Sequence, residues 1–433
     1  MSALLSSGSN AHGQLSNGSQ DDSHEFRPCS FYRCLPGELP PQTRRVKHIA
    51  SGANHTLVLL ETYDQSGELQ INLWGCGDGK AGQLGTAHQE EIRAGSLSTV
   101  FKPIDLSLGQ EGLGHYRIKT VAAAWETTYI ALSCVGKGDV LISMGSDDFG
   151  DLGVGVLKKG QAKRSFHVIS FDHLTIDSMS VDTKSVVIQS LVAGQHHAVV
   201  HLQATLSNGN IRRFAVGWGT SRHGQLGNVV SQTGKMPPFV SRPQVLSVYD
   251  PKDPTISASL GIQHTVFLHA SRKVTGVGSN RKGQLQGVEG IEGVTTLGCT
   301  WNGTYVYTQG NDGNTRVIAT GSHLHGQLGR ELHRPLGLPS LASVDFPFLS
   351  GSRRIKDIAC GSEHVLALAL LDNESTEVWG WGWNEHGNLG TGSTDNVLTP
   401  VRVWPRDSNT VTPSQKAAGI WAGSGTSWIY VTT

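Results

Sequence analysis

The stretch GSHLHGQLG (321–329) belongs to a pattern that runs through the whole chain: a glycine, several polar residues, and then Gly-Gln-Leu-Gly or a near copy. Six further copies are GSNAHGQLS (8–16), GCGDGKAGQLG (75–85), GSDDFGDLG (145–153), GWGTSRHGQLG (217–227), GSNRKGQLQ (278–286) and GWNEHGNLG (382–390). Self-similarity at a period of tens of residues is the mark of a repeat architecture. Seven in-phase copies carry far more weight than a single glycine-rich match.

A second pattern lies between these copies and consists of small residues, a glycine, two variable residues, often a histidine, and then alternating apolar residues. Its seven copies are IASGANHTLVL (49–59), VAAAWETTYIAL (121–132), LVAGQHHAVV (191–200), ASLGIQHTVFL (258–268), LGCTWNGTYVY (297–307), IACGSEHVLAL (358–368) and IWAGSGTSWIY (420–430). Alternating apolar and β-branched or aromatic residues predict a strand, and the turn signals that follow predict a second strand. Each unit is therefore expected to form a short antiparallel sheet.

The ends of the chain indicate how these sheets are arranged. The chain starts with a Gly-Gln-Leu copy and ends with a histidine-type strand, so the two halves complete one unit. If the ends are joined, the spacing from Thr426 round to His55 matches the spacing of the two units before it. An open solenoid would instead need capping repeats. We therefore predict an all-β, seven-bladed β-propeller over 1–433, with its last blade completed by about 1–20 with 420–433, and with no exposed strand edges.

Composition agrees with a folded, soluble chain. Glycine is abundant, with 54 residues against 16 prolines, and the 35 basic and 35 acidic residues cancel. A neutral chain lacks the electrostatic signature of a nucleic-acid binder. No apolar run long enough to cross a membrane occurs, and the six cysteines have no zinc-site spacing. We expect a cytoplasmic and nuclear protein with reduced thiols, no metal, no cofactor, no membrane contact and no direct nucleic-acid partner.

The paired motifs carry a resemblance to a known family. Gly-x-x-x-x-Gly-Gln-Leu-Gly together with Ala-x-Gly-x-x-His resembles the repeat of the regulator of chromosome condensation family, over nearly all 433 residues. That family forms seven-bladed propellers.

A narrower resemblance rests on segments that depart from the generic repeat, namely WETT (125–128), CTWNGTY (299–305), GSEH (361–364), WGWGWNEHGN (379–388) and TSW (426–428). In these places the chain looks like the fungal alpha-tubulin-suppressor, or killer-toxin-insensitive, branch of the family. The resemblance implies a heterodimer with a small CSL-type zinc-finger protein, with the Elongator complex as a further partner. It also implies a regulatory role in diphthamide synthesis and in Elongator-dependent tRNA wobble-uridine modification. The long loops 86–118, 153–186 and 228–257 are not explained by it.

The residues that precede each histidine position are expected to converge around one mouth of the ring, where loops carry function. The partner-binding residues that we predict there are Trp125, Glu126, Trp301, Asn302, Glu363, His364 and Trp383. An exposed tryptophan suits a binding hot spot, because it buries a large area and keeps one hydrogen-bond donor. The alternative is that Trp125 and Trp301 plug the channel or pack between blades. The repeated histidines are expected to pair with backbone groups of a neighbouring blade.

Catalytic signatures are not found. The sequence has no Gly-x-Ser-x-Gly elbow, phosphate loop, His-Glu-x-x-His or Cys-x-x-Cys motif. We therefore expect a non-catalytic adaptor rather than an enzyme. The alternative is a guanine nucleotide exchange factor for a Ran-type small GTPase, a role that belongs to the better-known branch of the same family.

Overall fold

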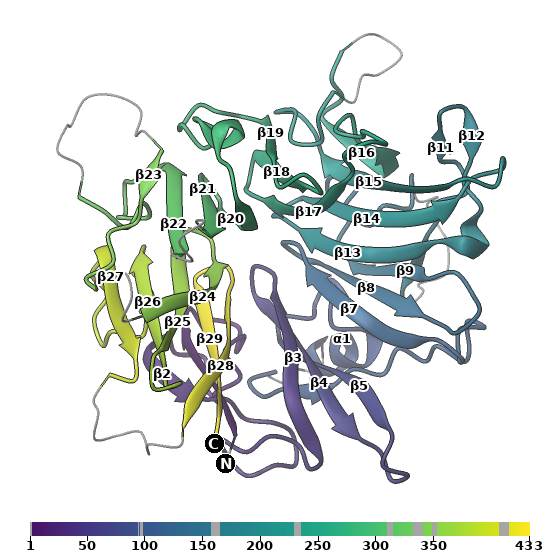
Figure 1. The fold of residues 1–433 in the computed structure, drawn as a ribbon. Coiled ribbons are helices and arrows are strands. Elements are labelled where there is room, and N and C mark those ends of the chain that lie inside the picture. Colours follow the sequence, from purple (N-terminus) through teal and green to yellow (C-terminus); the bar gives the residue numbers. More distant parts are fainter. Residues whose placement is uncertain are drawn as a thin grey trace.

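The chain folds into a ring of seven β-sheets, or blades, as predicted (Figure 1). The computed structural model describes residues 2–93, 95, 98–156, 165–228, 235–309, 315–331, 341–348, 353–406 and 415–433. Within these ranges six blades have four antiparallel strands and one has three. In six blades the first strand lies nearest the central channel and the later strands lie progressively further out, whereas in the blade that contains both chain ends the innermost strand is Lys416–Ala422.

The blades are numbered here along the chain. Blade 1 contains β3 (Thr43–Ser51), β4 (His55–Tyr63), β5 (Leu69–Gly77) and β6 (Lys102–Pro103). Blade 2 contains β7 (Arg117–Ala123), β8 (Thr127–Ser133), β9 (Val140–Gly145) and β10 (His167–Ile169). Blade 3 contains β13 (Val187–Ala193), β14 (His197–Thr205), β15 (Ile211–Thr220) and β16 (Phe239–Val245).

The second half of the ring follows the same plan. Blade 4 contains β17 (Thr255–Leu260), β18 (His264–His269) and β19 (Val274–Gly278). Blade 5 contains β20 (Val294–Thr300), β21 (Gly303–Gln309), β22 (Thr315–Gly321) and β23 (Ala342–Ser343). Blade 6 contains β24 (Arg353–Cys360), β25 (His364–Leu371), β26 (Thr376–Gly382) and β27 (Val397–Trp404).

Blade 7 is built from both ends of the chain and closes the ring. Its strand order is β2 (Ser23–Pro28), β1 (Ala3–Gly8), β29 (Thr426–Thr432) and β28 (Lys416–Ala422). β1 and β29 pair in antiparallel register from Ala3 opposite Val431 to Gly8 opposite Thr426. The predicted closure is therefore confirmed, although the N-terminal share extends to Pro28 rather than to about residue 20, because the outermost strand β2 follows the first glycine motif.

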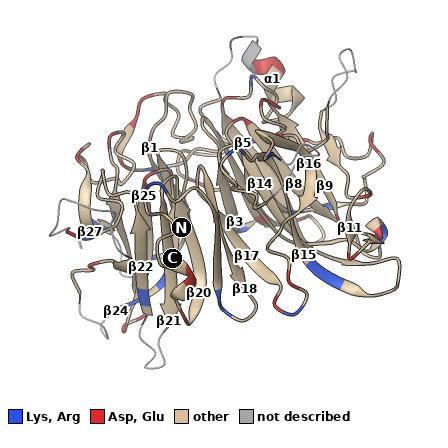
Figure 2. Ribbon diagram, turned by 90° about the horizontal axis from the view of Figure 1, so that it is seen from above, with Lys and Arg blue, Asp and Glu red and all other residues tan. Residues whose placement is uncertain are grey.

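The three long loops contain structure that the sequence patterns did not reveal. The 86–118 segment includes the helix α1 (Thr86–Arg93), which Figure 2 shows at one edge of the molecule. The 153–186 segment includes the hairpin β11 (Thr175–Ile176) and β12 (Met179–Ser180), followed by the 3-10 turn η1 (Thr183–Ser185). The 228–257 segment includes β16 and the start of β17. Parts of these segments, namely 94, 96–97, 157–164 and 229–234, lie outside the described residues.

Blade 4 explains one irregularity of spacing. The histidine positions of blades 4 and 5, His264 and Gly303, lie much closer together in the chain than those of any other two consecutive blades. The described part of blade 4 has no fourth strand, and the short 3-10 turn η2 (Val288–Gly290) connects it to β20. The shorter spacing therefore reflects a smaller blade.

The hydrophobic core lies between neighbouring blades. The middle strands β4, β14 and β25 are buried along most of their length, on both faces of their sheets. Five leucines of the glycine motifs have no exposed surface, namely Leu15, Leu84, Leu226, Leu328 and Leu389. Since each sheet is covered on both sides by its neighbours, no blade can bury its own apolar faces alone.

The repeated histidines form a latch between consecutive blades. His55 Nε2 lies 3.1 Å from the hydroxyl of Thr128 in the next blade, and that hydroxyl donates to the Gln83 carbonyl at 2.8 Å. The same contact joins His197 to Thr265, His264 to Thr304 and His364 to Ser427, at 2.9 to 3.1 Å. The predicted pairing with a neighbouring blade is thus correct, but the partner is a side-chain hydroxyl rather than a backbone group.

The glycine three residues before each histidine makes room for the imidazole ring. A Cβ added to Gly194 would lie 2.9 Å from Cε1 of His197, closer than atoms normally approach. In blade 5 the larger and the smaller residue exchange places: Thr300 occupies the glycine position and Gly303 occupies the histidine position. The combined volume of the two positions is therefore constrained more strongly than the identity of either residue.

A double-mutant cycle tests this constraint. Gly194→Ala crowds the ring, and we expect it to lower the free energy of unfolding by about 1–3 kcal/mol. His197→Ala removes a fully buried ring and its hydrogen bond, and we expect a loss of about 2–4 kcal/mol. The double variant should lose less than the sum by about 1 kcal/mol or more, because the two changes share one space. Urea unfolding measures all three. Gly109→Ala, where an added Cβ meets no atom within 4 Å, is the control. Strict additivity would contradict the constraint.

The buried histidines also predict acid sensitivity. Burial lowers the pKa of His197 to about 3, and those of His55, His264 and His364 to about 4. The unfolded chain binds these protons near pH 6.5, so between these values the unfolded state carries more protons than the folded state. The free energy of unfolding should therefore fall as the pH falls from about 6.5 to 4, by about 1.4 kcal/mol per pH unit for each histidine.

Urea titrations at several pH values test this. His197→Ala should show a shallower pH dependence than the natural chain, while replacing the exposed His323 by alanine should leave the slope unchanged. Equal slopes in all three proteins would show that His197 does not drive the acid sensitivity.

Candidate functional site

Backbone hydrogen bonds between blades fix the mouth of the channel. The loops between the first and second strands meet there, and residues from all seven blades line a channel cavity of about 130 Å³. Trp125 N donates to Gln195 O at 2.8 Å, and its own carbonyl accepts from Ala53 N at 2.9 Å. Trp301 N donates to Ser362 O at 2.7 Å, and its carbonyl accepts from Ile262 N at 3.0 Å. Each tryptophan is thereby held by both neighbouring blades.

Trp125 and Trp301 meet over the channel. They come from blades 2 and 5, which are not neighbours, yet their ring centroids lie 6.2 Å apart at 45°. Both rings line the channel cavity, and both remain half-buried rather than fully covered. The two residues therefore cap the channel and also present aromatic surface at its mouth. That they bind a partner stays a prediction.

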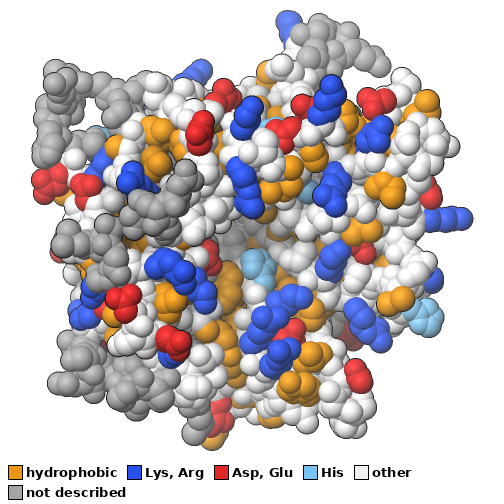
Figure 3. All heavy atoms as spheres, viewed as in Figure 1, with side chains coloured by type: hydrophobic (Ala, Val, Ile, Leu, Met, Phe, Trp, Pro, Cys, Tyr) orange, Lys and Arg blue, Asp and Glu red, His pale blue; other side chains and the backbone are white. Residues whose placement is uncertain are grey.

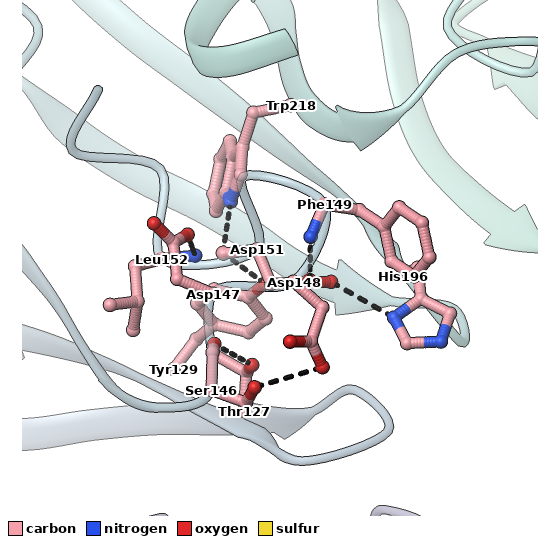
Figure 4. A network of polar contacts seen from close by, with 10 residues as sticks. All are labelled: Thr127, Tyr129, Ser146, Asp147, Asp148, Phe149, Asp151, Leu152, His196 and Trp218. Atoms are coloured by element: carbon pink, nitrogen blue, oxygen red, sulfur yellow. Dashed lines mark hydrogen bonds and ion pairs between the residues drawn. The ribbon is translucent and has the colours of Figure 1, made fainter. Parts of the chain in front are cut away.

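His196 and Phe149 extend these rings into an aromatic cluster. His196 lies 6.2 Å from Trp125 and 4.7 Å from Phe149, the latter in a T-shaped arrangement. Figure 4 shows how Asp151 holds this end of the cluster: one carboxylate oxygen lies 3.3 Å from His196 Nδ1, and the other accepts the Phe149 backbone N–H at 2.9 Å. The Asp151 side chain is almost fully buried, and its contact with Nδ1 orients the His196 ring.

Asp151 performs two tasks because it replaces the motif glutamine. In four other copies of the motif the glutamine oxygen accepts the backbone N–H two residues earlier, as Gln225 does from His223 at 3.0 Å. The aspartate keeps that bond and uses its second oxygen for the histidine. Sequence reasoning did not select Phe149, Asp151 or His196 as site residues. The sequence did contain a signal for Asp151, because GSDDFGDLG alone among the seven copies has an aspartate at the glutamine position.

Glu363 forms a polar centre on the other side of the mouth. Its carboxylate accepts from Asn302 Nδ2 at 2.7 Å and from Gln327 Nε2 at 2.8 Å. Burial raises the pKa of Glu363, and the two amide hydrogen bonds together with the charges of His325 and Lys282 oppose that rise. The predicted residues Asn302 and Glu363 are therefore in direct contact, while Gln327 was missed.

Trp383 lies at the same mouth. Its backbone N–H donates to Glu363 O at 2.9 Å, and its ring packs over Gly425 of blade 7. The ring also meets His386 in a T-shaped contact at 5.2 Å. Trp383 is half-buried and continues the surface from Glu363 towards blade 7.

Two predicted residues differ in their placement. Glu126 is half-exposed at the mouth, and its backbone carbonyl accepts from Ser146 N at 3.0 Å. His364 has no exposed surface and bonds Ser427, so its assignment to the partner-binding set is wrong. Its position one residue after Glu363 places it at the start of β25, where the side chain turns into the space between blades.

A separate pocket opens beside the aromatic cluster. It has a volume of about 470 Å³ and is lined by parts of blades 2, 3 and 4, including Phe149, His196, Arg222, His223, Phe239 and Ile262. We call it the blade-3 pocket. His196 belongs to both the cluster and this pocket, so the two form one continuous surface.

The face opposite the mouth has a different character. Figure 3 shows this face, with α1 on the far side, and Lys and Arg side chains are spread over it. Several are bound to acidic neighbours on the same sheet: Arg45 to Glu61 at 2.8 Å and Arg353 to Glu377 at 2.7 Å. Such pairs hold the strand ends of blades 1 and 6.

The described residues contain no group of three His, Cys, Asp or Glu side chains placed to hold a metal ion. No helix among them is both long and apolar enough to span a membrane. The six cysteines are unpaired, and burial raises the pKa of Cys29 to about 12.

Models of one repeat family match parts of the chain. The model of the regulator of chromosome condensation (RCC1) repeat matches residues 3–59 and 376–426, and a second model of the same repeat matches residues 355–388. The segments around β3 and β4 and around the chain ends, where the ring closes, are thus typical of this repeat.

Similar chains occur in mammals and in fission yeast. The secretion-regulating guanine nucleotide exchange factor of mouse is 28% identical over 92% of this chain and 78% of its own length. The bovine protein of the same name is 27% identical over 93% of this chain and 78% of its own length. An RCC1 repeat-containing protein of Schizosaccharomyces pombe is 24% identical over 99% of this chain and 98% of its own length.

Solved structures show the same fold over the full chain. Human WBSCR16 superimposes with a TM-score of 0.66 at 18% identity, covering 100% of this chain and 99% of its own. Prp20p of Saccharomyces cerevisiae, described together with its binding to Gsp1p and histones, superimposes with a TM-score of 0.67 at 16% identity, covering 100% of this chain and 92% of its own. At these identities the likeness concerns the fold alone.

Proposed function

Because the chain is a seven-bladed propeller that carries regulator of chromosome condensation repeats, we propose that it is a protein-binding platform whose mouth face holds a partner protein. The observation that carries this proposal is the contact of Trp125 and Trp301 across the channel. Two large rings are fixed by backbone bonds on both sides and still keep exposed surface. Preorganised aromatic side chains near the centre of a face are the usual anchors of protein interfaces.

The partner that we propose is a small CSL-type zinc-finger protein, bound as a heterodimer. The support is positional: WETT, CTWNGTY and GSEH, which carry the narrower resemblance, all contribute residues to this mouth. On this proposal the chain acts in the cytoplasm and nucleus as a non-catalytic adaptor in diphthamide synthesis and Elongator-dependent tRNA modification, and Elongator is a further partner.

Calorimetric titration with the CSL-type protein of the same organism tests this proposal. We expect 1:1 binding that Trp125→Ala or Trp301→Ala weakens by about 2–4 kcal/mol, since each change removes a central aromatic anchor. Val135→Ala, a fully exposed apolar residue of the β8–β9 turn on the opposite face, should bind like the natural chain. If the tryptophan variants remain folded and bind normally, the mouth is not part of the interface. No binding by the natural chain would remove this partner.

A second candidate, guanine nucleotide exchange on a Ran-type small GTPase, is favoured by one observation. The mouse and bovine relatives named above are exchange factors and align with more than nine-tenths of this chain. An exchange factor would use the same rigid mouth to stabilise a nucleotide-free GTPase rather than to hold an adaptor partner.

Release of a fluorescent GDP analogue from a Ran-type GTPase separates the two candidates. On the adaptor proposal we expect the release rate to equal the intrinsic rate at any concentration of the chain. The control is a known exchange factor assayed with the same GTPase. A rate that rises with the concentration of the natural chain, and not with the Trp301→Ala variant, would favour exchange over the adaptor role.

A further inference from the structure

The blade-3 pocket is a preformed site that the aromatic anchors do not account for. Its volume of about 470 Å³ falls within the usual range of about 300–1,000 Å³ for ligand sites. It lies beside the channel cavity rather than within it, and blades 2, 3 and 4 all contribute to its walls. The His197–Thr265 latch joins blades 3 and 4, and the backbone hydrogen bond from Trp125 N to Gln195 O joins blades 2 and 3.

The walls of the pocket are apolar and partly exposed to solvent. Phe149 and Phe239 are 40% and 42% exposed, and Ile262 closes the side formed by blade 4. Phe149 is fixed by its T-shaped contact with His196, which Asp151 holds in turn. Exposed aromatic rings that are held in place favour the binding of a bulky apolar side chain.

The rim of the pocket is positively charged. Arg222 and His223 line it, and Arg281 and Lys282 follow on the neighbouring blade-4 loop. Burial, together with the charges of Arg281 and Arg222, lowers the pKa of His223. The two loops are neighbours, since a Cβ added to Gly224 would lie 3.8 Å from the Cα of Gly278. Arg222, Arg281 and Lys282 are exposed, and none of them has an ion pair within the described part of the chain.

The acidic groups near the pocket form hydrogen bonds of their own and, within the described residues, no ion pair with this rim. Asp148 is the single acidic residue among the described residues that line it, and its carboxylate accepts from the Ser146 hydroxyl at 3.0 Å. Asp151 is buried beneath and bonded to His196 and the Phe149 backbone. Asp147 accepts the Leu152 backbone N–H at 2.9 Å. Among the described residues, Arg222, Arg281 and Lys282 thus have no ion-pair partner, unlike Arg45 and Arg353 on the opposite face.

We propose that the blade-3 pocket binds an acidic segment of the partner protein, with a bulky apolar residue seated between Phe149 and Phe239 and its flanking carboxylates on Arg222 and Arg281. The inference deepens the proposed function and rests on it only in that the mouth face receives a protein. Carboxylates bound by unpaired guanidinium groups gain charge-assisted hydrogen bonds, which are stronger than neutral ones. Unpaired rim charges also speed the encounter with an oppositely charged partner.

Fluorescence polarisation with three labelled nine-residue peptides tests the inference on the full chain. Each peptide has Leu-Phe at its centre, flanked by Glu, Ser or Lys residues. We expect the Glu peptide to bind at least about tenfold more tightly than the Ser peptide, and the Lys peptide not to bind. Arg222→Glu with Arg281→Glu should abolish the preference for the Glu peptide. Phe239→Ala should weaken all binding about tenfold or more, because it removes one apolar wall.

Matched controls separate the pocket from general charge and apolar effects. Lys80→Glu with Lys137→Glu makes the same change of net charge at exposed positions away from the pocket and should bind like the natural chain. Leu398→Ala removes a comparably exposed apolar residue from β27, the outer strand of blade 6, and should have no effect. Equal affinity for the Glu and Ser peptides, no binding of the Glu peptide, or a loss that the lysine control reproduces would overturn the inference.

This assay is independent of the identity of the partner. If the Glu peptide binds as expected while the CSL-type protein does not bind, the proposed ligand of the pocket is supported and the proposed partner is contradicted. If the CSL-type protein binds through the tryptophans but the arginine variant changes neither assay, the proposed function is supported. The proposal that the pocket binds an acidic segment is then contradicted.

Discussion

The pairing of β1 with β29 is the interaction on which the molecule depends. Each blade is a small sheet with apolar faces that only its neighbours can cover, so an open array would leave two bare faces and two free strand edges. One chain end, from Ala3 to Gly8, meets Val431 to Thr426 of the other and removes both edges at once. Closure also brings loops from all seven blades to one mouth.

The latch between blades explains the repeat motif in physical terms. A histidine of one blade bonds a hydroxyl of the next, and the glycine before it leaves room for the ring. The hydroxyl is present where the preceding blade supplies a histidine, and it is replaced by Ala198 and Val365 where blades 2 and 5 do not. Blade 7 also lacks the histidine, because Thr426 stands there, but Thr56 of blade 1 keeps the hydroxyl. Blades 2 and 5, where the histidine and the hydroxyl of the next blade are both missing, are the blades whose loops carry Trp125 and Trp301.

The mouth itself is asymmetric, although the ring is built from repeats. Trp125, His196 and Phe149 form an apolar band over blades 2 and 3, ending at a pocket with a basic rim. Asn302 and Glu363 form a hydrogen-bonded polar centre on blades 5 and 6. A face with such different regions has one favoured orientation for a partner, which is what a specific platform requires.

The sequence by itself determined the number of blades, the closure by the chain ends and the mouth residues, because these follow from period and order along the chain. It predicted Trp125, Trp301, Asn302, Glu363 and Trp383 at one mouth, and the structure places them there. Tertiary structure alone decided that Trp125 and Trp301 touch across non-neighbouring blades, and that His364 is buried one residue beyond Glu363. It also decided that Phe149, Phe239 and Arg222 share a pocket. Contacts between loops of different blades depend on the angles between sheets and on side-chain packing, which no local pattern records.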